Sequence, residues 1–194
     1  MTTTRRADPA QALRALISQV RAALPVAPAP HYVDPQIDPE VGWQRRLDRI
    51  RSALEQARSD LAGDGWVSGA WFAVATASGS RPATTAESFA LVRPGSTVAG
   101  ACLVGTLLRR AADPDRATSY DDVWGCVDEL YEAVHESMGH TSFPPGRCYP
   151  RTVQHARLRG VTAWNDTPGR THAEVLDLVD RAVSRTLVGA CTQA

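Results

Sequence analysis

The sequence predicts a mainly α-helical protein of the α+β class, with about five helices in a compact domain around a buried central helix. Three observations predict this class. Apolar residues recur every three or four positions in several long segments, and one segment is apolar on nearly every side. A proline-rich stretch sets the first helical segment apart as an N-terminal helical arm. A single short region has the pattern of a small β-hairpin.

The first helical segment is predicted to form an arm. Asp8 and Pro9 suit the N-cap and the first helical position. The apolar residues that follow share one stripe: Leu13, Leu16, Ile17, Val20 and Leu24. Residues 25–39 contain five prolines, which is typical of a semi-rigid extended linker. We therefore divide the 194-residue chain into an arm (1–24), a linker (25–39) and one globular domain (40–190).

The domain begins with a helix near residue 40 that carries a one-sided apolar seam. Residues 66–92 then change character, and we predict a hairpin whose strands lie near residues 71–74 and 89–92. Residues 98–112 are apolar on nearly all sides, so they are predicted to form the buried central helix. Further helices are predicted at three places: residues 119–138, 152–159 and 171–183.

The composition of the chain excludes several classes of function. Twenty-one arginines, with no lysine, balance 21 acidic residues, so no overall field directs the protein toward nucleic acid or anionic lipid. The longest apolar stretch is far shorter than the roughly 20 residues of a membrane span, and no secretory signal is recognised. The four cysteines lack zinc-like spacing. We expect a cytoplasmic protein that uses no metal or cofactor and has no membrane partner.

Three short motifs carry a resemblance to a known family. They are Gly65-Trp66, the run Cys102-Leu103-Val104-Gly105-Thr106-Leu107, and Trp164-Asn165-Asp166 leading into the closing helix. From about Leu47 to Val183 the chain resembles a family of small, uncharacterised bacterial and bacteriophage proteins known only as a domain of unknown function. In that family a Cys-Leu-x-Gly-x-Leu helix start and an Asn-Asp turn before the last helix recur together. The resemblance implies no activity.

Cys102 is the candidate for thiol chemistry. It lies near a predicted helix start, where the helix dipole lowers the pKa of a thiol and favours a nucleophilic thiolate. His140, His155 or His172 is available as a base, and Asn165 or Asp166 could orient it; His155 and Asp166 complete the catalytic set that we select. The alternative is that Cys102 is a small core residue at a place where backbones pass close together. Asp166 would then be a turn former ahead of a capped helix.

Six residues form the predicted ligand-binding set: Trp66, Trp164, Asn165, Arg147, Arg151 and Arg170. The two tryptophans and the amide could line a pocket, and arginine side chains suit phosphates and carboxylates. The alternatives are that the aromatic residues anchor the core, that Asn165 forms the turn, and that the arginines lie on a solvated face. No zinc template fits the histidines and cysteines, so no metal site is predicted.

We expect a non-catalytic binding or protein-interaction domain, with residues 8–24 mediating self-association or contact with a protein partner. Two alternatives remain open. One is a thiol-dependent hydrolase or transferase that uses Cys102. The other is phosphate or nucleic-acid binding through Arg147–Arg170, although net neutrality makes nucleic acid the weaker expectation.

Overall fold

The computed structural model describes residues 39–93, 95–115 and 118–191. Its mainly α-helical architecture with a small sheet confirms the predicted class. Residues 8–24 and nearly all of the predicted linker lie outside the described residues, so their predicted roles stay predictions. The elements follow one another in this order: α2 (Pro39–Asp64), β1 (Phe72–Thr76), β2 (Gly79–Pro82), α3 (Thr85–Leu91), β3 (Gly100–Ala101), α4 (Leu103–Ala112), α5 (Tyr120–Ser137), α6 (Arg151–Asn165) and α7 (His172–Cys191).

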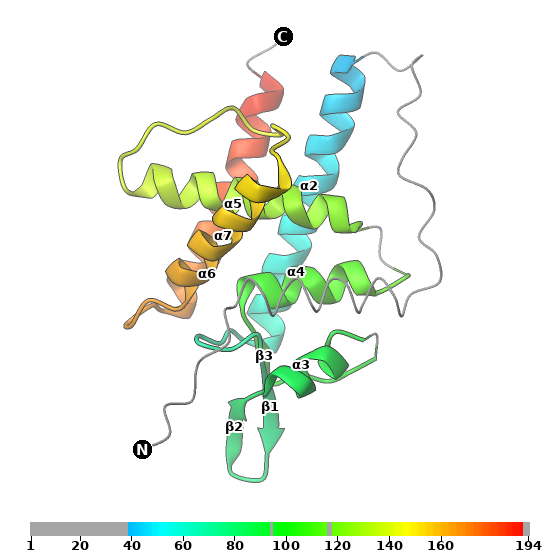
Figure 1. Ribbon diagram of the computed structural model, residues 1–194, viewed down its shortest axis with the longest axis vertical. Coiled ribbons are helices and arrows are strands. Elements are labelled where there is room, and N and C mark those ends of the chain that lie inside the picture. Colours follow the sequence, from blue (N-terminus) through cyan, green and yellow to red (C-terminus); the bar gives the residue numbers. More distant parts are fainter. Residues whose placement is uncertain (1–38, 94, 116–117, 192–194) are drawn as a thin grey trace.

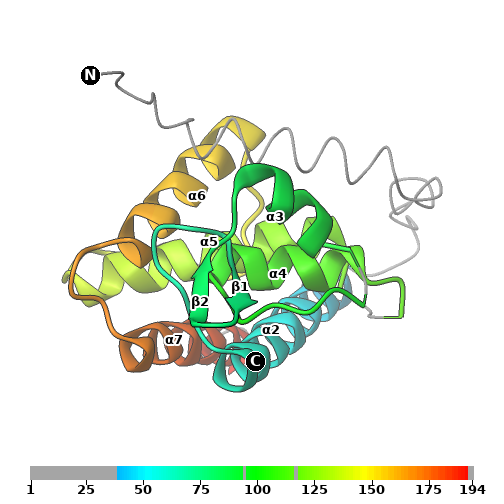
Figure 2. The same ribbon diagram turned by 90° about the horizontal axis from the view of Figure 1, so that it is seen from below.

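The helices form three layers (Figure 2). The helices α2 and α7 run side by side in one layer, α4 and α5 form the middle layer, and α6 covers α5 from the other side. The middle helix α5 packs against α2, α4, α6 and α7. The small sheet and α3 lie at one end of the molecule, beyond α4 (Figure 1). The predicted buried helix is therefore present as α4, but it shares the centre with α5.

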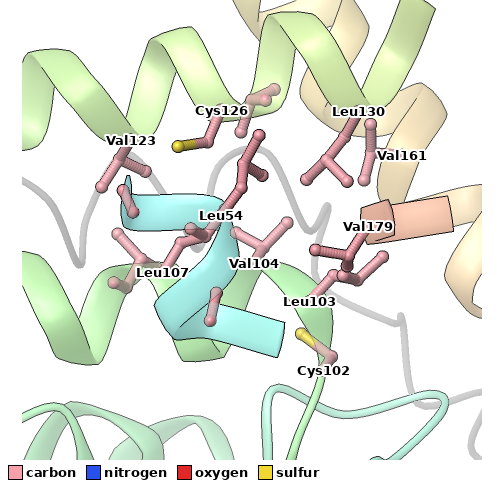
Figure 3. Packing of buried hydrophobic residues seen from close by; sticks show 14 of the residues in the cluster. Leu54, Cys102, Leu103, Val104, Leu107, Val123, Cys126, Leu130, Val161 and Val179 are labelled. Carbon is pink, nitrogen blue, oxygen red and sulfur yellow. The ribbon is translucent and has the colours of Figure 1, made fainter. Parts of the chain in front are cut away.

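The core consists of apolar side chains from all three layers. Leu54 of α2, Leu107 of α4 and Leu130 of α5 are at most 1% exposed. Val161 of α6 and Val179 of α7 meet them from the outer layers and are fully buried (Figure 3). Side chains from five helices thus bury one another, and this burial is the main source of stability for the domain.

The predicted second strand of the hairpin, near residues 89–92, is wrong. This segment lies largely in the helix α3, because Thr84 and Glu87 form a capping box that starts a helix. The Glu87 amide donates to Thr84 Oγ1 at 3.3 Å, and the Thr84 amide donates to Glu87 Oε2 at 2.7 Å. The hairpin partner of β1 is instead β2, whose four residues are all exposed and carry no apolar alternation.

The start and length of two helices also differ from the predictions. The segment expected to be one helix from residue 98 begins with β3, which pairs antiparallel with β1, and the helix α4 starts only at Leu103. An apolar run of this kind does not distinguish a buried strand from a buried helix. The short helix predicted at residues 152–159 extends over the whole of Arg151–Asn165.

Gly105 allows the backbone of α4 to approach the segment that leads into β1. A Cβ atom at this position would lie 2.5 Å from the carbonyl oxygen of Trp71 and 2.9 Å from Cε1 of Phe72. We expect Gly105→Ala to lower the free energy of unfolding by about 1–3 kcal/mol, the usual cost of overpacking. Urea denaturation measures this loss.

The matched control is Gly63→Ala near the end of α2, where a Cβ atom would meet nothing within 4 Å. This variant should unfold at an equal or higher urea concentration than the native protein, since alanine favours a helix by about 1 kcal/mol over glycine. If Gly105→Ala raised the free energy of unfolding as much as Gly63→Ala, this result would contradict the close approach of α4 to Trp71.

Candidate functional site

Cys102 lies at the N-cap of α4, as its predicted position near a helix start requires, but it is buried. Cys102 is 4% exposed, and its sulfur accepts a hydrogen bond from the Gly105 amide at 3.3 Å. Burial raises the pKa of the Cys102 thiol to about 12, and the hydrogen bond from Gly105 offsets only part of this rise. Figure 3 shows its sulfur beside Leu103 at the edge of the core cluster. At neutral pH the thiol is therefore protonated.

The three residues selected for catalysis lie in two places. Asp166 follows the last residue of α6 and raises the pKa of the Cys102 thiol through its charge. His155 lies nearly three turns earlier on α6, about 15 Å from its end at 1.5 Å per residue. There its ring packs edge-on against Trp124 of α5, with 5.1 Å between the ring centroids. This geometry gives no support to a Cys102–His155 pair.

The turn after α6 is tied to the segment before β1 through three hydrogen bonds. The Trp66 indole donates to Asn165 Oδ1 at 2.8 Å, and Asn165 Nδ2 donates to the Val67 carbonyl at 3.3 Å. The Gly69 amide donates to Asp166 Oδ1 at 2.8 Å. We call these five residues the Asn165 clasp. The clasp joins two of the segments that carry the family resemblance, and it occupies polar atoms that were expected to meet a ligand.

The predicted ligand-binding arginines do not share one site. Arg170 stacks on Trp164, with its guanidinium carbon 3.9 Å from the ring centroid, and pairs with Glu174 at 3.0 Å. Arg151 stands at the opposite end of α6, about 21 Å from Asn165 at 1.5 Å per residue, and pairs with Asp121 at 2.9 Å. Only Trp66, Trp164, Asn165 and Arg170 of the predicted set lie together near the clasp.

Arg147 packs against two aromatic rings of its own loop. Its guanidinium carbon lies 4.9 Å from the centroid of Phe143 and 5.4 Å from that of Tyr149. Within the run Arg147–Arg170, Arg157 is buried rather than solvated. The run is therefore not one basic face.

A group of buried acidic residues on α5 was not predicted. Asp128, Glu129 and Glu132 are at most 4% exposed. Arg157 of α6 pairs with Asp128 at 3.4 Å and contacts Glu132, while Arg185 of α7 pairs with Glu129 at 3.1 Å. Burial raises the pKa of the Asp128 and Glu129 carboxyl groups, against the opposing effect of the arginines. Neither arginine is close to α5 in sequence, so no spacing rule indicates these pairs.

The buried acids fix the loop formed by residues 139–150. The Gly146 amide donates to Glu129 Oε1 at 2.8 Å, and the Phe143 amide donates to Glu132 Oε2 at 3.1 Å. Arg185 donates to the Phe143 carbonyl at 2.7 Å. Gly146 has a φ of 71°, and a Cβ atom there would lie 2.8 Å from Leu47 Cδ2. The loop is thus held closely against α2, α5 and α7.

This loop forms one wall of a largely apolar groove of about 660 Å³, which is also lined by Trp43 of α2, Glu136 near the end of α5 and residues in the last turns of α7. We call it the α2–α7 groove. Its apolar lining includes Trp43, Phe143, the two prolines that follow Phe143, and Val188. Phe143 is 51% exposed and Val188 is 65% exposed. The groove combines residues from both ends of the domain and from its middle. No pattern in the sequence indicates that these segments meet.

A second hollow, of about 250 Å³, lies between α2, α4 and the segment after α3. Its lining is mainly polar, and Arg109 crosses it to donate to the Ser96 carbonyl at 2.6 Å and to pair with Asp64 at 3.5 Å. Among the described residues, no three or more His, Cys, Asp or Glu side chains gather as a metal site would require. The α2–α7 groove is therefore the better candidate for binding.

The chain belongs to a family of unknown function, DUF6197, whose model matches residues 45–185. The matched range extends from α2 into the last part of α7 and contains the clasp and the buried acids. No curated protein and no solved structure matches the chain. None of the helices in the described ranges combines the length and apolar character that crossing a bilayer demands.

The burial of Cys102 predicts how its thiol reacts. At about pH 8, a pKa of about 12 leaves only about one thiolate in 10⁴. Iodoacetamide should therefore modify the exposed Cys148 rapidly, and Cys102 and Cys126 only after denaturation, as peptide mass spectrometry would show.

The raised pKa of the Cys102 thiol also makes the stability of the protein depend on pH. The folded protein retains the Cys102 proton that the unfolded chain loses above about pH 8.5, so this contribution is complete below that pH. It then falls as the pH rises toward 12. Native-state labelling of Cys102 as fast as that of Cys148 would contradict both expectations.

Proposed function

We propose that the protein is a non-catalytic binding domain whose α2–α7 groove takes an apolar peptide segment of a protein partner. The observation that carries this proposal is the groove itself. Its volume of about 660 Å³ falls within the roughly 300–1,000 Å³ of ligand sites, and apolar side chains dominate its exposed lining. We also propose a cytoplasmic location, because Cys102, Cys126 and Cys148 are free thiols.

The walls of the groove support peptide binding because they are fixed before any partner arrives. The loop wall is tied through Gly146 and Phe143 to carboxylates buried on α5. The opposite wall consists of two long helices packed side by side. A preformed site avoids the entropy cost of ordering a loop during association.

The lining of the groove favours an amphipathic helix as the bound segment. Two helices and an apolar loop line the groove, and Phe143 and Val188 are its exposed large apolar residues. Amphipathic helices bind such troughs through apolar side chains spaced three and four residues apart. Arg181 and Ser184 on the same stretch of α7 are available for polar contacts at the rim.

The two alternatives receive less support from the same geometry. A thiol enzyme would need a base beside Cys102, whereas His155 packs against Trp124. Phosphate binding through Arg147–Arg170 would need convergent arginines. Instead, Arg151, Arg157 and Arg170 each pair with a carboxylate of the protein.

A phage-displayed library of amphipathic helical peptides tests the proposal when selected on the full-length protein. We expect enriched peptides that share apolar residues at three- and four-residue spacing. Their affinity should fall at least tenfold for Val188→Asp, because a charge would enter the apolar edge of the groove.

The matched control is Ala173→Asp, which introduces the same charge at an exposed position of the same helix outside the groove lining. This variant should bind the peptides as the native protein does. Failure to enrich any peptide, or equal binding by the native protein and Val188→Asp, would overturn the proposed function.

A further inference from the structure

The beginning of α2 and the end of α7 lie side by side at one end of the molecule (Figure 1). Among the described residues, six large apolar side chains are exposed, and four of them belong to the elements that line the groove: Val41, Phe143, Leu187 and Val188. Exposed apolar side chains on neighbouring elements are typical of an interface. We therefore expect another apolar segment to pack against this surface.

The chain carries a suitable segment directly upstream of the groove. Residues 1–38 precede α2, and Trp43, which lines the groove, stands on the second turn of that helix. The predicted linker between Leu24 and Pro39 has 14 residues, which span up to about 43 Å in an extended polyproline conformation at 3.1 Å per residue. This reach exceeds the distance needed to return to a site beside the attachment point.

The chemistry of the upstream segment also fits the groove. Its apolar stripe has the three- and four-residue spacing that an apolar trough binds: Leu13, Leu16, Ile17, Val20 and Leu24. The intervening positions include Arg14 and Arg21, which would remain on the solvent side of a bound helix. A segment with this pattern buries its stripe only by packing against another apolar surface.

We infer that residues 10–24 occupy the α2–α7 groove of their own chain as an amphipathic helix and compete there with the partner segment. This inference rests on the proposed function, since it assigns an occupant to the same groove. The arm is then an intramolecular regulator, because a partner binds only by displacing it. Breaking the apolar stripe of the arm opens the groove without altering the groove walls.

The tether makes this competition strong even when the contact is weak. A tether that spans the distance to its site gives an effective concentration on the order of 1 mM. If the free segment binds with a dissociation constant of about 50 μM, the attached segment weakens any competitor about 20-fold. An effect of this size is readily measured.

Fluorescence anisotropy with a fluorescein-labelled peptide of residues 8–24 tests the inference on full-length proteins. The native protein is compared with Leu16→Asp/Val20→Asp, which breaks the stripe, and with Arg14→Asp/Arg21→Asp, a matched change on the polar side. We expect the stripe variant to bind the peptide at least tenfold more tightly than the other two. Adding Val188→Asp to the stripe variant should abolish this binding, while circular dichroism reports that the helices are intact.

Equal peptide affinity for the native protein and the stripe variant would overturn the inference. A dimer of the native protein that dissociates in the stripe variant, detected by analytical ultracentrifugation, would also overturn it by assigning the arm to a second copy. If displayed peptides bind the groove but the peptide of residues 8–24 does not, the proposed function stands and only the occupant is wrong. If neither binds, both proposals fail.

Discussion

The buried carboxylates of α5 are the constraint on which the binding surface depends. A carboxylate at the centre of three helical layers is tolerated only with cations and hydrogen-bond donors around it. Here Arg157 reaches Asp128 and Glu132 from α6, and Arg185 reaches Glu129 from α7. The acids therefore help to fix the relative positions of α5, α6 and α7.

These ion pairs specify a conformation more than they add stability. Burial raises the pKa of the Glu129 carboxyl group, so its partners offset only part of the cost of keeping it charged. The remaining acceptor capacity of Glu129 goes to the Gly146 amide, and Arg185 also holds the Phe143 carbonyl. These contacts hold the loop against α2, α5 and α7, and the groove lies beside the loop in this position.

Periodicity predicts most of the architecture because helices such as α2 and α7 bury one stripe of the sequence. Periodicity failed where an apolar run was too short to identify its element, as at β3, and where β2 lacked apolar residues. The capping pair Thr84 and Glu87 was a readable signal for α3, and it outweighs the strand preference of the residues that follow.

The site was less predictable because its parts are distant in the sequence. The prediction concentrated on the turn at Asn165, where the clasp turns out to join α6 to the segment before β1. The pair Glu129–Arg185 spans 56 positions, and the groove adds Trp43 from a third region. No local rule relates these residues, and only the packed helices bring them together.

Hydrogen exchange at the Gly146 amide tests the central claim most directly, because this amide donates to the buried Glu129. The measurement compares the native protein, Arg185→Met, and the control Arg181→Met. Arg181 lies one turn away on α7, and its exposed side chain makes only a long ion pair with Asp177, at 4.0 Å. The account predicts strong protection of the Gly146 amide in the native protein and in the control. It also predicts that protection is lost in Arg185→Met, where an unpaired Glu129 costs about 3–5 kcal/mol. Rapid exchange at Gly146 in the native protein, or unchanged protection in Arg185→Met, would contradict the claim that the buried ion pairs build the groove.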